Sequence, residues 1–257
     1  MQERSYLPIR IIPRLDVKGQ NVVKGVHMEG LRVVGDPATL AEKYYEAGAD
    51  EILYMDIVAS LYGRPLDLDL VKSVADKIHI PLMVGGGIRS IRDIEYALRA
   101  GADKIAINTF ATKDPAFLGE AVRRFGAQCV TLSVEAKRQV DGRYEAYTDG
   151  GRERSGREVV AWIKEAHGFG IGEISITSID RDGTRRGFDH ELTKAVNGLG
   201  DVPVVVHGGA GDLTHILEVI RECEPSAVSL ATMLHYDELP LLALKADLAR
   251  AGLHVRV

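Results

Sequence analysis

One pattern occurs twice in this chain: a short apolar segment, strand-like in character, runs into a cluster of glycines just before a stretch with helical spacing. Residues 203–211 read PVVVHGGAG and precede a predicted helix near residues 212–221, and residues 80–89 read IPLMVGGGIR before a predicted helix near residues 91–98. A buried strand that breaks into glycines at a helix N-terminus presents bare backbone N–H groups, which suit a phosphate. Two such sites, roughly half a chain apart, predict a duplicated barrel that holds a substrate by two phosphates.

Strand-like and helix-like segments alternate along the whole sequence, with no low-complexity linker between them. Eight strand–helix units in one chain predict a single (β/α)8 barrel of class α/β, a TIM barrel, over residues 1–257. A doubly wound open sheet is the alternative, but it does not account for the internal repeat described below. The predicted strands are 9–17, 51–57, 81–84, 104–107, 129–136, 173–177, 202–206 and 227–231, and the predicted helices are 38–47, 67–77, 91–99, 115–125, 158–167, 190–196, 212–221 and 239–251.

The two halves of the chain resemble each other. GADEILYMD at residues 48–56 matches GIGEISITS at residues 170–178, and IPLMVGGG matches VPVVVHGG. Matched segments lie roughly 120 positions apart, which corresponds to four strand–helix units rather than to a solenoid period. The repeat therefore predicts two duplicated half-barrels, roughly residues 1–125 and 126–257.

The composition is that of an ordinary globular protein. Of 257 residues, 46% are hydrophobic and 27% are charged, with a net charge of −5. This acidic balance gives no reason to expect binding to nucleic acid or to an anionic membrane surface, and no segment has a signal-peptide or membrane-span pattern. Cys129 and Cys223 lack metal-ligand spacing, so we expect small buried residues. We expect a cytoplasmic protein without a metal or another cofactor.

Two carboxylates end corresponding strands of the halves. Asp16 ends the first predicted strand and Glu135 the fifth, each after apolar residues. Active sites of (β/α)8 barrels lie at the carboxyl ends of the strands, and opposed carboxylates there form a natural general acid/base pair. Lys18 and Lys137 follow two residues later and are candidates to neutralise them, so a purely structural salt-bridge interpretation also remains open.

Glycines and small polar residues at other strand ends are candidates for binding phosphate. Tight turns between a strand and a helix require glycine anyway, but two such clusters related by the repeat favour phosphate binding. The first predicted site consists of Gly86, Gly87, Asn108 and Thr109, and the second of Gly208, Gly209, Ala231 and Thr232.

The segment after the sixth strand, residues 178–184, reads SIDRDGT and is dense in polar groups. It is either a simple Asp-Gly turn or a loop that contacts substrate. Its place at the catalytic end favours the second interpretation, with Thr177, Asp182 and Gly183 as substrate-binding candidates. Lys24, in the loop predicted at residues 19–30, is a candidate cation that reaches over the mouth to a phosphate.

Charged residues also open four of the strands, at the opposite end of the barrel. Arg10, Glu51, Lys104 and Glu173 are each followed at once by apolar residues. Alternating signs there are typical of weak surface ion pairs. Arranged around the barrel axis, the same four side chains would instead form a ring that closes the bottom of the pore.

Together these motifs resemble a known family. IIPRLDVK, VVKG, VGGGIR, GADKIAINT, EISITSIDRDGT, GFD and HGGAG are similar to segments of the cyclase subunits of imidazole glycerol phosphate synthase, and the likeness covers nearly all of the chain. The resemblance implies a (β/α)8 lyase of histidine biosynthesis. Such an enzyme takes a bis-phosphorylated ribulosyl-formimino aminoimidazole carboxamide ribonucleotide and ammonia, and forms imidazole glycerol phosphate and aminoimidazole carboxamide ribonucleotide.

The resemblance also implies a partner and roles for individual residues. A glutamine amidotransferase docks at the bottom of the barrel, forms a heterodimer, and supplies ammonia through the pore. Asp16 is then one catalytic acid/base and Glu135 the other. The set Arg10, Glu51, Lys104 and Glu173 matches the family's ammonia gate.

Some positions depart from the family pattern. Glu135 stands where the family has an aspartate, and His207 and Gly150 each replace a serine. The segments RLDVKGQN, VEAKR and EAYTDGGRERSG are more similar to a paralogous branch associated with surface-polysaccharide synthesis. We expect the ammonia-using cyclase; the alternatives are amidation of a nucleotide-linked sugar and a non-catalytic scaffold that activates a glutaminase.

Overall fold

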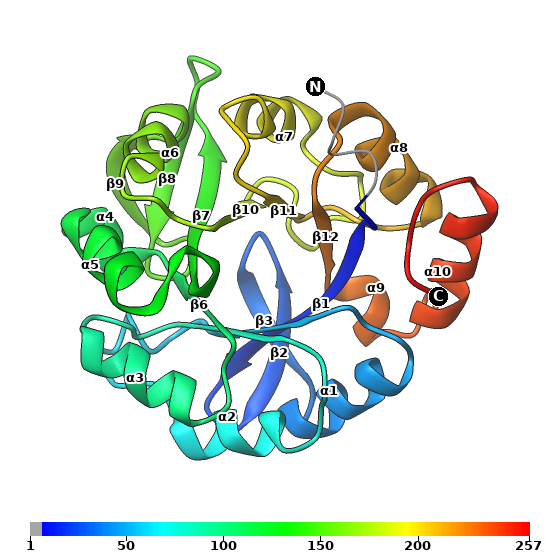
Figure 1. The fold of residues 1–257 in the computed structure, drawn as a ribbon. Helices are drawn as coiled ribbons and strands as arrows, with labels where there is room; N and C mark the ends of the chain where they lie inside the picture. The colour runs from blue at the N-terminus through cyan, green and yellow to red at the C-terminus, as the bar shows by residue number, and fades with distance from the viewer. Residues whose placement is uncertain (1–6) are drawn as a thin grey trace.

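The computed structural model describes residues 7–257, and its centre is a closed barrel of eight parallel strands surrounded by helices (Figure 1). Each barrel strand pairs with its neighbour in chain order, and the barrel closes because the last strand pairs with the first. In sequence order the barrel strands are β1 (Arg10–Lys18), β4 (Ile52–Asp56), β5 (Leu82–Gly85), β6 (Lys104–Ile107), β7 (Val130–Arg138), β10 (Glu173–Ser178), β11 (Val204–His207) and β12 (Ala227–Leu230). The predicted (β/α)8 barrel is confirmed, and the open-sheet alternative is wrong because β12 pairs with β1 in parallel.

Eight main helices follow the barrel strands in turn, close to the predicted positions. Several begin with a side-chain cap that satisfies a free backbone N–H group, as Asp36, Ser90 and Asp212 do. The main helices are α1 (Pro37–Glu46), α2 (Leu68–Ala75), α3 (Ile91–Arg99), α5 (Ala116–Phe125), α6 (Val159–His167), α7 (His190–Asn197), α8 (Leu213–Cys223) and α10 (Leu241–Arg250); the short ones are α4 (Thr109–Lys113), α9 (Thr232–His235) and a 3-10 turn (Ala127–Cys129).

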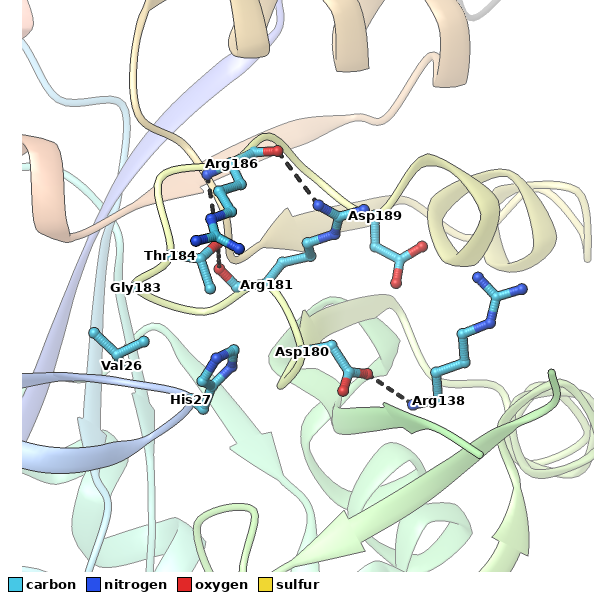
Figure 2. Close-up of a pocket in the computed structure, with 9 residues that line it drawn as sticks. All are labelled: Val26, His27, Arg138, Asp180, Arg181, Gly183, Thr184, Arg186 and Asp189. Carbon is cyan, nitrogen blue, oxygen red and sulfur yellow. Dashed lines mark hydrogen bonds between the residues drawn. The ribbon is translucent and has the colours of Figure 1, made fainter. Parts of the chain in front are cut away.

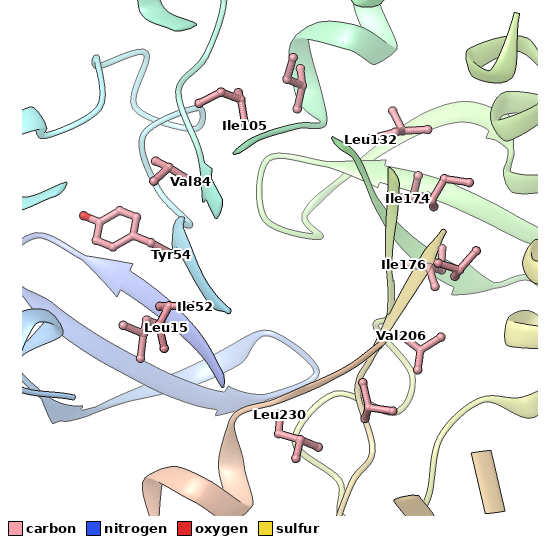
Figure 3. Packing of buried hydrophobic residues seen from close by; sticks show 14 of the residues in the cluster. Leu15, Ile52, Tyr54, Val84, Ile105, Leu132, Ile174, Ile176, Val206 and Leu230 are labelled. Carbon is pink, nitrogen blue, oxygen red and sulfur yellow. The ribbon is translucent and has the colours of Figure 1, made fainter. Parts of the chain in front are cut away.

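Side chains on the outer face of the barrel form the main hydrophobic core. Successive residues of a strand point to opposite faces, so every second residue packs outward against the helices. Figure 3 shows part of this layer, with buried side chains carried by neighbouring barrel strands. Its labelled members are Leu15, Ile52, Tyr54, Val84, Ile105, Leu132, Ile174, Ile176, Val206 and Leu230.

Side chains on the inner face form a second, smaller apolar layer across the barrel interior. It contains Ile12, Leu53, Met55, Met83, Ala106, Val205 and Ala227. This layer separates the charged residues at the strand starts from the polar residues at the strand ends. The barrel therefore has two chemically distinct ends.

Two antiparallel hairpins stand where loops were predicted. β2 (Asn21–Val26) and β3 (Glu29–Gly35) replace most of the predicted loop after the first strand, and β8 (Tyr144–Thr148) and β9 (Glu153–Glu158) form the polar insertion before α6. β2 continues antiparallel from β1, and β8 from β7. The hairpins hold corresponding places in the two halves, in line with the duplication, whose boundaries stay a prediction.

The remaining general expectations concern the cysteines and the membrane. Cys129 and Cys223 are both buried, as predicted, and both are free thiols. Within residues 7–257, every helix is too short or too polar to span a bilayer.

Candidate active site

Asp16 and Glu135 lie on opposite sides of the barrel mouth. Four strand-to-strand steps separate β1 from β7, half the circumference of the barrel. Both carboxylates are inward-facing, and each residue is only 6% exposed. Burial of a carboxylate is unfavourable unless it is paired or protonated, and the two residues meet this requirement in different ways.

Asp16 is paired with cations. Arg14 Nε donates to Asp16 Oδ1 at 2.7 Å, and Lys24 Nζ lies 3.6 Å from Asp16 Oδ2. Burial alone would raise the pKa of Asp16, but the charges of Arg14 and Lys24 outweigh it and hold that pKa below its ordinary value. The prediction that Lys18 neutralises Asp16 is wrong: Lys18 is exposed at the last position of β1, and the cations beside Asp16 are Arg14 and Lys24.

Glu135 receives only uncharged donors. Asn108 Nδ2 donates to Glu135 Oε2 at 3.1 Å, and the Gly151 backbone N–H donates to the same oxygen at 2.8 Å. Burial raises the pKa of Glu135 from 4.5 to about 7, although Arg14 and the Gly151 N–H oppose that rise. Lys137 does not pair with Glu135 as predicted; it is exposed, with its Nζ over the ring of Tyr147.

The β2–β3 hairpin brings Lys24 to the loop after β10. Lys24 Nζ donates to Asp182 Oδ1 at 2.6 Å, and the backbone N–H of His27 donates to Asp182 O at 2.8 Å. Burial alone would raise the pKa of Asp182, but Lys24 and the neighbouring His207 lower it strongly. The hairpin is therefore fastened across the mouth by a buried ion pair, and Lys24 is committed to carboxylates in this conformation. Gly183 lies directly beneath the hairpin: a Cβ there would come 2.3 Å from Gly25 O.

His207 completes the polar floor of the mouth. Its Nδ1 lies 3.0 Å from the carbonyl oxygen of Ser229, so this nitrogen carries the proton and donates. Burial and the nearby Arg14 lower the pKa of His207, although Asp182 opposes that effect. Nε2 faces Asp182 Oδ1 at 3.3 Å and has no hydrogen bond to the described residues.

The first predicted phosphate site is a small cavity beside Glu135. It has a volume of about 40 Å³ and is lined by Gly86, Gly87, Asn108 and Thr109 among others. Gly86 has φ +102°, and a Cβ there would lie 2.2 Å from the backbone oxygen of Asp56. Only glycine fits this turn, so the four predicted residues are brought together by the backbone itself.

The second predicted site is more open. Gly183 and Thr232 line a cavity of about 700 Å³ together with Lys24, Arg32 and Arg185. Gly208 and Gly209 form the neighbouring turn with φ +103° and +108°, and Ala231 immediately precedes α9. Arg32 and Arg185 were not predicted. They come from β3 and from the end of the SIDRDGT loop, and only the folded hairpin brings them to one cavity.

A further cavity lies between the hairpin tip and the loop after β10 (Figure 2). It has a volume of about 550 Å³, and its lining includes the guanidinium groups of Arg138, Arg181 and Arg186. His27 lies on its floor, where Nδ1 is 2.9 Å from Ile179 O. Its lining also includes Asp180 and Asp189, and Val26 and Gly183 line both this cavity and the one at the second predicted site.

Arg10, Glu51, Lys104 and Glu173 form a closed ring at the other end of the barrel. Arg10 donates to Glu51 at 2.8 Å and to Glu173 at 2.6 Å, and Lys104 donates to the same two carboxylates at 2.9 and 3.1 Å. Each of these side chains contacts two side chains of opposite charge. The four residues therefore form a continuous ring and not separate surface ion pairs.

Between this ring and the mouth, the interior carries polar groups as well as the apolar layer. The hydroxyl groups of Ser175 and Ser229 are buried and have no hydrogen-bond partner among the described residues. Such hydroxyl groups are suited to a small polar molecule inside the barrel.

Thr177 and Arg14 form one further contact, and Arg14 is a buried residue of the mouth that was not predicted from the sequence. Arg14 Nη1 donates to Thr177 Oγ1 at 2.9 Å, so Thr177 serves as an acceptor. A signal for Arg14 existed: it precedes Asp16 by two residues on the same strand and so shares its inward face. No group of three or more His, Cys, Asp or Glu side chains in residues 7–257 is arranged to hold a metal ion.

Comparison with known proteins agrees with this geometry. A family model described as "Histidine biosynthesis protein" matches residues 10–240. The imidazole glycerol phosphate synthase subunit HisF of Legionella pneumophila is 57% identical over 205 residues, which make up 80% of this chain and 97% of that protein. The subunit of the same name from Myxococcus xanthus is 48% identical over 247 residues, covering 96% of this chain and 97% of that protein. That of Streptococcus gordonii is 44% identical over 248 residues, covering 96% and 98%.

Proposed function

This chain belongs to the histidine biosynthesis protein family, and from that premise we propose that it is the cyclase subunit of an imidazole glycerol phosphate synthase, a carbon–nitrogen lyase. The substrates are ammonia and the bis-phosphorylated ribulosyl-formimino aminoimidazole carboxamide ribonucleotide. The products are imidazole glycerol phosphate and aminoimidazole carboxamide ribonucleotide.

The observation that carries this proposal is the unlike state of the two opposed carboxylates. Cations lower the pKa of Asp16, while burial raises that of Glu135 to about 7. Pairs of titratable groups whose environments push their pKa values apart divide the roles of base and acid between them. Asp16 therefore accepts a proton from the incoming nitrogen, and Glu135 donates one to the departing amine.

The two glycine turns hold the phosphates in this proposal. One phosphate lies against Gly86, Gly87, Asn108 and Thr109, beside Glu135. The other lies against Gly183, Gly208, Gly209, Ala231 and Thr232, with Thr177, Lys24 and Asp182 next to it. Because the cavity beside Glu135 measures only about 40 Å³, the substrate enters after the loops that line this cavity have moved apart.

The relatives are named as subunits, so the chain works in a complex. We propose that the partner is a glutamine amidotransferase, which forms a heterodimer at the strand starts and delivers ammonia into the barrel. The ring of Arg10, Glu51, Lys104 and Glu173 is the gate. The unpartnered hydroxyl groups of Ser175 and Ser229 offer hydrogen bonds to ammonia beyond it.

The test is turnover of the ribonucleotide by the isolated chain with an ammonium salt as nitrogen source. A cyclase forms imidazole glycerol phosphate without a glutaminase. A scaffold that only activates a glutaminase neither forms product nor binds a bis-phosphorylated ligand, and either result would contradict the proposal.

One observation favours a second candidate, ammonia-dependent amidation of a nucleotide-linked sugar. Arg14 and His207 both project into the mouth of the barrel, and both are at least 95% buried. A mouth filled in this way suits release of ammonia to an acceptor outside the barrel. Incubation with a nucleotide-linked sugar and ammonium salt, in parallel with the ribonucleotide, distinguishes the two functions by which compound is consumed.

A further inference from the structure

Arg14 is an unusual residue to find inside a barrel. Its side chain is about 1% exposed, and it projects from β1 into the interior two residues before Asp16. One edge of the guanidinium donates to Asp16 at 2.7 Å and another to Thr177 at 2.9 Å. These are buried, specific contacts, unlike those of a surface arginine that samples many conformations.

The two contacts join strands that do not pair with each other. β1 carries Arg14 and Asp16, and β10 carries Thr177, with β11 and β12 between them in the barrel. Arg14 therefore reaches across the interior and sets the position of Asp16 relative to the far wall. A planar guanidinium with two fixed partners orients a carboxylate more strictly than a flexible ammonium group does.

Electrostatics gives the same residue a second effect. A buried guanidinium is strongly destabilised without a carboxylate, so Arg14 favours the ionised form of Asp16. Its charge also acts on Glu135, where it opposes the effect of burial. Glu135 nevertheless lacks any direct cationic partner among the described residues, whereas Asp16 has one at 2.7 Å.

We propose that Arg14 is a positioning residue that fixes the Asp16 carboxylate against Thr177 and keeps it ionised while Glu135 holds the proton. The inference rests on the proposed function of the two carboxylates. The proposal attributes the difference in proton affinity between Asp16 and Glu135 to Arg14. Arg14 itself transfers no proton, because an arginine stays charged at every accessible pH.

Other titratable and charged groups also face Asp16 and Glu135 and affect their pKa values. Asp16 is faced by Arg14 on β1, Lys24 on β2, Asp182 after β10, His207 on β11 and His235 on α9; Glu135 is faced by Arg14 and Asp16 on β1 and by Asp149 between β8 and β9. Lys24 is the other cation near Asp16, but it lies 3.6 Å away and is 2.6 Å from Asp182. Removal of Arg14 thus takes away the principal partner of Asp16.

The experiment follows both carboxyl groups directly in the full-length chain labelled with carboxyl-13C aspartate and glutamate. Signals are assigned from the Asp16→Asn and Glu135→Gln proteins. We expect Arg14→Gln to raise the pKa of Asp16 by about one unit or more, a tenfold or larger change in its ionisation constant. Arg14→Lys keeps a charge and leaves that pKa closer to the wild-type value.

Turnover with ammonium salt provides the second readout. In Arg14→Gln we expect kcat to fall by about 10²-fold, the scale of a misplaced catalytic group, with the acidic limb of the pH profile moved to higher pH. Arg14→Lys should lie between Arg14→Gln and wild type. Arg154→Gln is the control, because Arg154 also pairs with a carboxylate, Glu145 at 2.6 Å, but is exposed on β9 and contacts neither Asp16 nor Thr177.

An unchanged Asp16 pKa in Arg14→Gln would overturn the proposal, even if that variant is less stable. If Arg14→Gln does not fold, Arg14→Lys decides: a kcat and an acidic limb identical to wild type would overturn it. A wild-type chain that does not turn over the ribonucleotide would defeat the proposed function alone. The carboxyl titration would still decide the role of Arg14.

Discussion

Glu135 allows a test of the asymmetric carboxylates that requires no substrate. Its pKa rises from 4.5 to about 7 because the side chain is buried without a cationic partner of its own. Since one pKa unit corresponds to about 1.4 kcal/mol, the ionised form costs about 3 kcal/mol more in the folded protein than in the unfolded chain. The substitution Glu135→Gln removes this cost while preserving the shape and the contacts of the side chain.

The sign of the effect follows from proton linkage. A group whose pKa is raised on folding contributes stability that is complete below its unfolded pKa and is lost as the pH rises through its folded pKa. The stability of wild type relative to Glu135→Gln should therefore fall by about 3 kcal/mol between pH 4 and pH 9, with most of the change between pH 4.5 and about 7.

Urea denaturation of both proteins across this pH range measures the difference. Glu145→Gln is the control with the opposite sign, because a hydrogen bond from Arg154 lowers the pKa of Glu145. The stability of wild type relative to Glu145→Gln should decrease as the pH falls. A wild-type minus Glu135→Gln difference that stays constant from pH 4 to pH 9 would refute the argument that burial keeps Glu135 protonated.

Three further predictions concern the mouth, the ring and the first glycine turn. Asp16→Asn should lower ammonium-driven kcat by about 10²–10⁴-fold while leaving binding of a bis-phosphorylated ligand nearly intact; a loss below about tenfold would remove Asp16 from the mechanism. Glu173→Gln should reduce glutamine-driven turnover of the complex more than ammonium-driven turnover, and equal losses would argue against a gate. Gly86→Ala should weaken ligand binding and lower the melting temperature, because its Cβ would lie 2.2 Å from Asp56 O. Gly19→Ala is its control, with positive φ and open space around the Cβ; equal effects of the two substitutions would mean that contact at the turn is unimportant.

Much of the architecture was predictable because local patterns carry it. Alternating strand and helix segments, glycines at strand ends and helix caps such as Asp36 and Asp212 are each decided within a few neighbouring residues. The closed barrel then follows from the number of units. The hairpins were not predicted from the sequence. The turn after β2 contains His27 and Met28 with positive φ angles, which no sequence pattern indicates.

The positions of the site residues at the mouth of the barrel were predictable, but their contacts were not. Asp16, Glu135 and the glycine turns could be located because barrel strands end at a common face. Their partners could not, because pairing depends on which side chains face each other across the interior. The lysines close in sequence, Lys18 and Lys137, are exposed, and the actual partners of Asp16 are Arg14 and the more distant Lys24.

The sequence alone determined the barrel, its two glycine turns and the two carboxylates at the strand ends, since each depends on short-range spacing. Only the tertiary structure decided that the pKa of Asp16 is lowered and that of Glu135 is raised. That difference comes from burial and from charges on other strands: Arg14 and Lys24 converge on Asp16, while Glu135 meets an amide and a backbone N–H. Proton affinity depends on distances through space, and closure of the barrel sets those distances.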